Sequence, residues 1–302
     1  MLLALLLAFD FAVPADWMAR NAELLRNRQL ASVVLPGSHD AASYSLGRGS
    51  SVCAARASSA FAALGAFVAA PRARTQEVTL SRQLEAGVRY LDLRVCAVPG
   101  EPRRFFMHHT WVGAPAAEAL DQIDAFSRAH PREILLLDFQ HLSGFDDADR
   151  RQFAAELEQR FRGRMLPIGQ NPGALTVQKL WDMGVSVLVF VEHPPRSPHL
   201  FGREHALVSR WPRARSIRAL VDALPWMAED TAELHVLQWQ LTPGFAEFLR
   251  HPWSSLIDFA AGANQLILDG TLPRLVPRAR MNVVMTDDAA KVAKAIARLN
   301  EP

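Results

Sequence analysis

The chain has 302 residues, with 50% hydrophobic and 21% charged side chains. This composition is typical of a packed globular protein and excludes a disordered chain, a coiled coil and a fibrous repeat. The 33 basic and 31 acidic residues give a formal net charge of only +2, so we expect no nucleic-acid partner.

The N-terminal end is apolar from Met1 to Phe9. This run is too short to span a bilayer, and no basic residue precedes Asp10, so residues 1–15 are interpreted as either a signal peptide or an N-terminal extension. No later stretch reaches ~18 uninterrupted apolar residues, so we expect no transmembrane segment. The sequence leaves secreted and cytoplasmic locations open.

The chain has two cysteines, Cys53 and Cys96. They allow at most one disulfide bond and lack the spacing of a metal finger. We interpret them as buried or free thiols in preference to a bridge.

Residues 16–302 are expected to form one catalytic domain, in which short apolar runs alternate with segments of helical periodicity. Runs of this length, rich in Val, Ile, Leu and Phe, predict buried strands. The predicted strands are 32–35, 90–95, 104–108, 133–139, 185–191, 206–210, 235–241 and 282–286. The predicted helices are 116–130, 147–161, 217–224 and 289–299, and a loop at 47–74 is expected to carry a short helix within 60–70. Eight strands alternating with helices predict an α/β fold of the (β/α)8 TIM-barrel type.

Polar residues gather where these strands end. TIM barrels build their active sites at the carboxyl ends of the strands, so we expect the functional site there. The residues at these ends include His39, Asp40, Asp92, Arg94, His108, His109, Asp138, Gln140, His141, Glu192, Trp239 and Asp287.

Two histidines beside an arginine can cleave a phosphodiester without a metal ion. Imidazole titrates near neutral pH, so His39 and a histidine on the third strand can serve as general base and general acid. Arg94 keeps its charge and presents donors that fit a phosphate. Asp92 lies two residues away on the same face and can orient Arg94, and Asp287 can fix the tautomer of one histidine.

Two other interpretations of these residues stay open. Arg94 and Asp92 can form an ordinary buried ion pair. Asp92, Asp138 and a histidine can hold a hard cation, although the fixed charge of Arg94 would oppose the ion.

The sequence also resembles a known family. Residues 35–40 read LPGSHD and residues 83–94 read QLEAGVRYLDLR, and both resemble motifs of the phosphatidylinositol-specific phospholipase C X-domain family, in its single-domain branch. Softer similarities lie at 15–18, 105–108, 133–141 and 282–287. The resemblance therefore extends from Ala15 to Asp288.

The resemblance implies an irregular TIM barrel and a phospholipase C-type phosphodiesterase that uses no metal and no cofactor. Calcium-dependent members keep a carboxylate where Arg94 stands, and metal-independent members keep an arginine. His39 would take the proton from the inositol 2-hydroxyl, Arg94 would stabilise the phosphate, and His108 would protonate the leaving diacylglycerol oxygen. The first product would be a cyclic inositol phosphate. The supporting carboxylates would be Asp40, Asp92 and Asp287.

The chain departs from the family at the position after the second histidine, where the usual glycine is replaced by His109 if His108 is the catalytic residue. The residues expected to bind the headgroup are Gln140, Glu192 and Trp239. The expected partners are a phospholipid or related phosphodiester and, transiently, a membrane surface, touched by residues 60–70 and 111–117. A monomer is expected.

Two alternative functions remain open. One is a metal-dependent glycerophosphodiesterase or a sphingomyelinase-D-like barrel, which would need a cation bound by carboxylates. The other is a catalytically silent lipid-binding protein.

Overall fold

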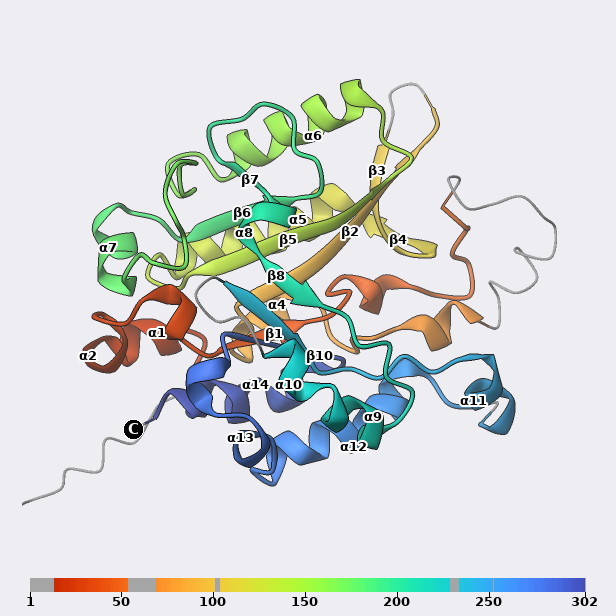
Figure 1. Ribbon diagram of the computed structural model, residues 1–302. Coiled ribbons are helices and arrows are strands. Elements are labelled where there is room, and N and C mark those ends of the chain that lie inside the picture. Colours follow the sequence, from red (N-terminus) through yellow and green to blue (C-terminus); the bar gives the residue numbers. More distant parts are fainter. Residues whose placement is uncertain (1–13, 54–68, 101–103, 229–233, 252, 302) are drawn as a thin grey trace, which may run out of the picture.

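The structure is a computed structural model that describes residues 14–53, 69–100, 104–228, 234–251 and 253–301. Eight strands form a curved parallel sheet in the order β7-β6-β5-β2-β1-β10-β9-β8 (Figure 1). These strands are β1 (Leu35–Ser38), β2 (Tyr90–Val98), β5 (Leu135–Ser143), β6 (Val187–Val191), β7 (Leu200–Gly202), β8 (Val208–Arg210), β9 (His235–Gln238) and β10 (Val283–Thr286). Within the described residues no pairing joins β7 to β8, so the barrel is irregular and open between them. The predicted α/β fold of the TIM-barrel type is confirmed.

One predicted barrel strand has a different place. Strand β3 (Arg104–His109) runs antiparallel to β2 and turns into β4 (Trp111–Pro115), so it belongs to a hairpin outside the barrel path. The short strand β7, which was not predicted, supplies the missing barrel strand. The prediction of residues 104–108 as a barrel strand is wrong because an apolar run indicates a strand without identifying its partner.

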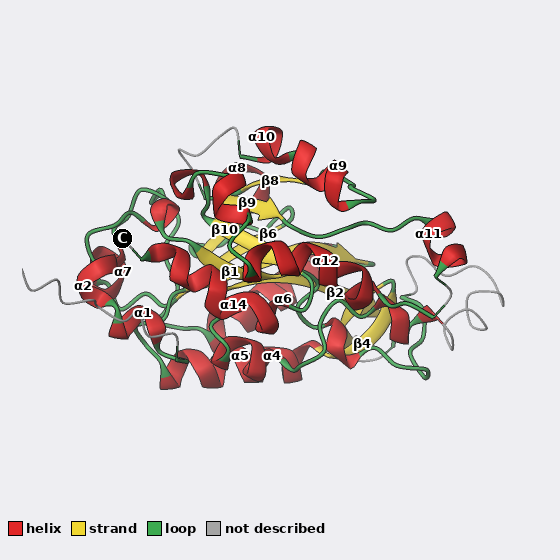
Figure 2. Cartoon of the chain, turned by 90° about the horizontal axis from the view of Figure 1, so that it is seen from below, coloured by secondary structure: helices red, strands yellow, loops and turns green. Residues whose placement is uncertain are grey.

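Helices cover the outside of the sheet, as Figure 2 shows from below. The predicted helices at 116–130, 147–161 and 289–299 are confirmed, and the one at 217–224 is divided into α9 and α10. Most of the segment 60–70 lies outside the described residues. The helices are α1 (Trp17–Arg20), α2 (Ala22–Leu25), α4 (Leu80–Glu85), α5 (Ala116–Ala129), α6 (Asp147–Arg160), α7 (Val177–Asp182), α8 (Arg203–Ala206), α9 (Ile217–Asp222), α10 (Leu224–Met227), α11 (Phe245–Arg250), α12 (Leu256–Leu268), α13 (Leu272–Leu275) and α14 (Ala289–Ala297).

Local sequence explains where the longer helices begin and which face they bury. Helix α6 begins at a capping box, in which the side chains of Asp146 and Asp149 accept hydrogen bonds from each other's backbone N–H groups. Helix α5 buries Ala119, Leu120 and Ile123 at helical spacing. These side chains join the core that packs against β2 and β5.

The amino ends of the strands are closed by a buried ion pair. Arg89 and Glu133 are fully buried and 2.6 Å apart. The Glu133 carboxylate also accepts hydrogen bonds from the backbone N–H groups of Met18 and Ala19, so it fixes the N-terminal segment beneath the barrel.

Cys53 and Cys96 form a disulfide bond. The interpretation of these residues as free thiols is therefore wrong. The two cysteines are 43 positions apart in the sequence, and it is the fold that brings them together.

None of the helices in the described part of the chain has the length and hydrophobicity required to cross a membrane.

Candidate active site

The carboxyl ends of three neighbouring strands bring the main polar residues together. Ser38 at the end of β1 lies opposite Thr286 at the end of β10 and opposite Leu91 in β2. The residues just beyond these positions are His39, Asp287 and Asp92. The parallel register thus places the three side chains at one edge of the sheet.

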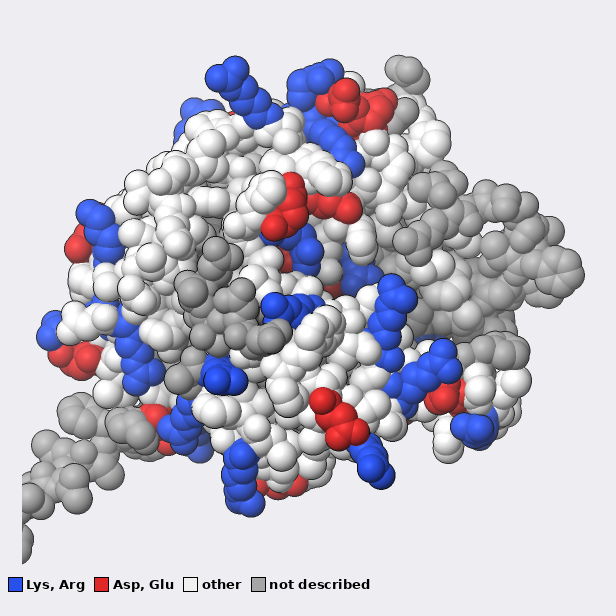
Figure 3. Space-filling view, in the orientation of Figure 1, with Lys and Arg blue, Asp and Glu red and all other residues white. Residues whose placement is uncertain are grey.

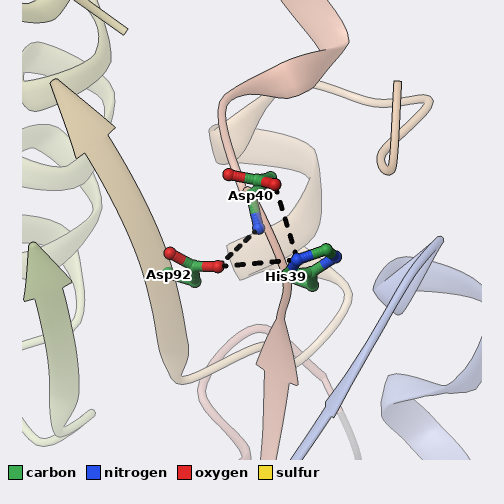
Figure 4. A group of neighbouring side chains, drawn as sticks. All are labelled: His39, Asp40 and Asp92. Atoms are coloured by element: carbon green, nitrogen blue, oxygen red, sulfur yellow. Dashed lines mark hydrogen bonds and ion pairs between the residues drawn. The ribbon is translucent and has the colours of Figure 1, made fainter. Parts of the chain in front are cut away.

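Backbone contacts fix the turn after β1. The N–H of His39 donates to the carbonyl of Thr286, and the N–H of Asp40 donates to Asp92 Oδ2 at 3.1 Å. Asp40 has a φ of 41°, a left-handed conformation that turns the chain sharply after His39. Figure 4 shows His39, Asp40 and Asp92 converging from β1 and β2.

His39 is oriented by a buried carboxylate. Its Nδ1 lies 2.6 Å from Asp287 Oδ1, so Nδ1 carries the proton of this hydrogen bond and Nε2 faces the centre of the site. Burial of the ring acts to lower the pKa of His39, but the Asp287 and Asp40 carboxylates outweigh it and raise that pKa to about 9.

The two segments that carry His39 and Asp287 are themselves held by buried side chains. Thr75 and Gln76 both donate to the His39 carbonyl, and Gln76 also donates to the Thr286 carbonyl. Asn264 donates to the Asp287 carbonyl. These hydrogen bonds hold the carboxyl ends of β1 and β10 in one geometry.

Arg94 crosses the same space from β2. Its Nε lies 2.7 Å from Asp40 Oδ1, and its Nη2 lies 3.1 Å from Asp92 Oδ2 and 3.2 Å from His39 Nε2. Burial opposes the charge, but the two carboxylates outweigh it and raise the pKa of Arg94. Among the described residues no hydrogen bond engages Nη1. Because the side chain is 18% exposed, Nη1 can donate to an incoming anion.

His39, Asp40 and Asp92 also have the donor atoms of a metal site, because their ligand atoms lie within 4.8 Å of one another. Arg94 occupies the space that a cation would need, since it contacts the oxygens of both carboxylates. A fixed positive charge at this distance would strongly repel a divalent ion. The donor set therefore fits an arginine better than a metal.

A histidine of the β3–β4 hairpin completes the group. His109 Nε2 lies 3.2 Å from Asp40 Oδ2, and its Nδ1 lies 2.9 Å from the Ala73 carbonyl. The rings of His39 and His109 are 6.2 Å apart. Both ring nitrogens of His109 thus face acceptors, which favours a protonated imidazole, but burial outweighs the Asp40 carboxylate and lowers the pKa of the ring.

The sequence-predicted His108 has a different environment. Neighbouring residues on a strand point to opposite faces, so His108 and His109 cannot present their rings in the same way. The side chain of His109 is 21% exposed, whereas His108 is buried. Burial acts to raise the pKa of Asp40, and the charges of His109, His39 and His108 act to lower it. Among these three histidines, His108 lowers the pKa least.

A cavity of about 180 Å³ lies beside Arg94, at the ends of β5, β6 and β7. His141 lies opposite Arg94 in the register of β2 and β5, which places the cavity next to the polar group around Arg94. Two predicted headgroup residues, Gln140 and Glu192, line this cavity. The full lining is Gln140, His141, Glu192, His193, Arg203 and Glu204.

The third predicted headgroup residue does not join them. Trp239 is fully buried in the core, where its indole N–H donates to the Ala263 carbonyl. This prediction is wrong because the Trp239 side chain, which follows β9, packs against helix α12 inside the core. It has no exposed surface to offer a ligand.

Sequence reasoning missed Arg203. Its Nε lies 2.9 Å from Asp138 Oδ1, and Asp138 also accepts a hydrogen bond from the Tyr90 hydroxyl at 2.5 Å. The buried Asp138 thus fixes the guanidinium at the cavity wall. Arg203 directly follows the three-residue strand β7. A prediction of that strand would have placed Arg203 at a strand end, among the candidate site residues.

No family model matches the chain. PI-PLC X domain-containing protein 2 of Homo sapiens is 31% identical over 239 residues, which cover 76% of this chain and 78% of the human protein. Variant-surface-glycoprotein phospholipase C of Trypanosoma cruzi is 29% identical over 290 residues, covering 85% of this chain and 76% of that protein.

Among solved structures, phosphatidylinositol-specific phospholipase C from Listeria monocytogenes has a TM-score of 0.66 and 18% sequence identity, covering 96% of this chain and all of that chain. At this identity the likeness shows a shared fold. The human relative, matched over more than three quarters of both proteins, shows more: the chain belongs to the PI-PLC X domain-containing protein family.

Proposed function

We propose that this protein is a metal-independent phosphodiesterase of the phospholipase C type, which cleaves phosphatidylinositol or a closely related diester. The observation that carries the proposal is the carboxylate of Asp40. His39, Arg94 and His109 all approach it, at 3.4, 2.7 and 3.2 Å. A base, a cation and an acid therefore surround one small space.

His39 acts as the general base. Its Nδ1–H is held by Asp287, so the ring, once deprotonated at Nε2, presents that lone pair to the inositol 2-hydroxyl. The proton moves from that hydroxyl to Nε2, and the oxygen attacks phosphorus in line with the leaving oxygen. The P–O bond to diacylglycerol breaks, and a cyclic inositol phosphate forms.

Arg94 stabilises the charge that accumulates on the phosphate oxygens. Nε and Nη2 are held by Asp40 and Asp92, so the guanidinium is positioned before the substrate arrives. One such preorganised donor contributes about 10²–10³-fold in rate. No metal ion is needed for this role, and the position of Arg94 supports a metal-independent reaction.

We assign the general acid to His109 in place of His108. His109 donates toward Asp40 in its protonated form, and its partial exposure lets it reach a leaving oxygen. The resemblance adds a second reason, because the family usually has glycine directly after this histidine. Here the next residue, Thr110, has a φ of 66°, a conformation that favours glycine. The glycine position of the family then corresponds to Thr110.

The cavity beside Arg94 suits a polyol headgroup. Gln140 and Glu192 offer amide and carboxylate groups to hydroxyls, and Arg203 is fixed by Asp138 at the wall. Glu192 and Glu204 add negative charge to the lining, and Asp138 already balances the arginine. We therefore expect an inositol without additional phosphates to be the better substrate.

The same edge of the barrel carries a surface for transient membrane contact. Three side chains form what we name the apolar rim: Trp211, Leu249 and Trp253, which are 46%, 65% and 85% exposed. Trp211 directly follows β8, and the other two lie on and after α11, which follows β9. Because the barrel strands are parallel, the apolar rim lies at the edge that holds the catalytic group.

Arginines accompany the apolar rim. Arg213 lies over the ring of Trp211 and Arg72 over the ring of Trp253, at 5.0 and 5.7 Å. Figure 3 shows basic side chains, with acidic ones among them, in the region of α11. Exposed Trp and Leu beside arginines fit the interface of an anionic phospholipid membrane. The predicted contact through β4 has weaker support, because the residues of that strand are half-buried.

Phosphorus NMR of the products tests the reaction directly. The protein is incubated with phosphatidylinositol vesicles, with and without EDTA, beside a His39→Ala control. We expect a cyclic inositol phosphate resonance in both wild-type samples and none in the control. Activity lost in EDTA would favour a metal-dependent glycerophosphodiesterase-like reaction, and binding to vesicles without turnover would favour a silent lipid-binding protein.

A further inference from the structure

The disulfide bond lies next to the hairpin that carries His109. Backbone hydrogen bonds join the segment 51–53 to this hairpin: the N–H of Val112 donates to the Ser51 carbonyl at 2.7 Å, and the N–H of Cys53 donates to the Thr110 carbonyl at 3.1 Å. Val52 and Trp111 form an antiparallel bridge between them. The segment thus extends the hairpin by one short strand.

The bond from Cys53 to Cys96 closes a ring around the hairpin. Strand β2 pairs with β3, β3 pairs with β4, and β4 pairs with the segment 51–53. Cys96 belongs to β2, two residues beyond Arg94, so the disulfide returns the last strand covalently to the first. The catalytic arginine and the hairpin histidine therefore belong to the same cross-linked unit.

The turn inside this ring is strained. Thr110 has a φ of 66°, which costs energy for a β-branched residue. The backbone hydrogen bond from Cys53 holds the Thr110 carbonyl in this turn, and His109 is the residue just before it. If the turn relaxed to a negative φ, the peptide after His109 would rotate and carry its ring away from Asp40.

We propose that Cys53 and Cys96 are positioning residues for His109: their disulfide holds the strained turn at Thr110 and thereby keeps the imidazole against Asp40. This inference rests on the proposed function, because it treats His109 as the general acid. It links full activity to the oxidised state of the protein. The sulfur atoms take no part in the phosphodiester reaction.

The test compares the oxidised full-length protein with the same protein reduced under native conditions, with thiol counts by mass spectrometry. We expect reduction to slow the cleavage of phosphatidylinositol about tenfold, less than the roughly 10²–10⁴-fold contribution of a general acid, because His109 is displaced and not removed. A diester with a nitrophenol leaving group needs little acid assistance, so its cleavage should change much less. Reoxidation should restore the rate.

Two variants make the test specific. The Cys53→Ala/Cys96→Ala variant should match the reduced protein and should not respond to reductant. In Thr110→Gly the left-handed turn carries no steric cost, so reduction should have little effect on its rate. A general loss of stability would slow Thr110→Gly as well, and would slow both substrates equally.

Histidine titration by NMR gives a readout that is independent of turnover. On reduction, the titration of the His109 ring should move toward that of a solvated imidazole, while far-UV circular dichroism stays unchanged. If the fully reduced protein keeps both its rate and its His109 titration, the proposal is overturned. If the oxidised protein cleaves no diester, the proposed function fails, and the titration still decides whether the disulfide positions His109.

Discussion

Two arginines at strand β2, the fully buried Arg89 and the partly exposed Arg94, have opposite roles. Arg89 lies just before the strand, at the amino ends of the barrel, and all five of its N–H donors make hydrogen bonds. Arg94 lies toward the carboxyl ends, and its described contacts leave Nη1 without a hydrogen bond. A fully paired guanidinium holds the fold together, whereas an incompletely paired one at the mouth of the barrel can receive an anion.

The same contrast extends to the carboxylates. Glu133 faces Arg89 in a closed pair at the amino ends. At the carboxyl ends, Asp40 and Asp92 share Arg94 with two histidines, so the charges are balanced only as a group. Substitutions at the amino ends should therefore change stability, and substitutions at the carboxyl ends should change activity.

The strongest test of this contrast is Asp287→Asn. We expect about a 10³–10⁴-fold loss of turnover, because an amide no longer holds the required tautomer of His39. The limb of the rate profile that reports the ionisation of His39 should also move to lower pH, since burial lowers the pKa of His39 and Asp287 is the main group that raises it to about 9. Steady-state rates between pH 5 and about 10 measure both effects.

The ion pair between His39 and Asp287 also predicts how the stability of the protein depends on pH. The folded pKa of His39 lies above its unfolded value, so the pair stabilises the protein fully below about pH 6.5 and this contribution is lost as the pH rises toward about 9. Urea titrations of the wild type should show this decline, and Asp287→Asn should lack it. An equal decline in both proteins would contradict the assignment.

The next largest effect on turnover is expected for His109→Gln, and His108→Gln serves as the comparison. We expect His109→Gln to slow the cleavage of phosphatidylinositol about 10²–10³-fold, because the leaving oxygen loses its acid. A nitrophenol leaving group should recover most of this loss. If His108→Gln instead shows the large loss and the leaving-group rescue, the acid belongs to the other face of β3.

The two arginines can be compared by one conservative change. Arg94→Lys keeps the charge but loses the forked donors, so turnover should fall about 10²-fold with little change in unfolding free energy. Arg89→Lys should lower the unfolding free energy by about 3 kcal/mol, because buried acceptors lose their donors. The folded Arg89→Lys protein should retain turnover, as measured at a temperature below its transition.

The smallest effect concerns the apolar rim. Trp211→Ala/Trp253→Ala should weaken binding to anionic phospholipid vesicles about tenfold, because two exposed aromatic anchors are removed. Cleavage of a water-soluble diester should stay unchanged. Leu275→Ala, which removes an exposed apolar side chain on the segment preceding β10, is the matched control and should leave vesicle binding unaltered.

Much of the barrel, and the polar residues at its carboxyl edge, could be predicted from the amino-acid sequence. Runs rich in apolar residues identified β2, β5, β6 and β10, because strands buried on both faces need apolar side chains at most positions. The motifs around His39 and Arg94 gave the family, which the relatives confirm. The polar residues at the ends of β1, β2 and β10 converge because parallel strands in register bring their carboxyl ends to one edge.

The remaining features depend on contacts between distant parts of the chain. An apolar run does not encode its partner, so the hairpin position of β3, and with it the contrast between His108 and His109, depends on antiparallel pairing with β2. Three residues are too few for a periodic signal, which is why β7 and Arg203 were missed. The burial of Trp239 and the bond between Cys53 and Cys96 depend on neighbours far away in the sequence, and local patterns contain no information about those distances.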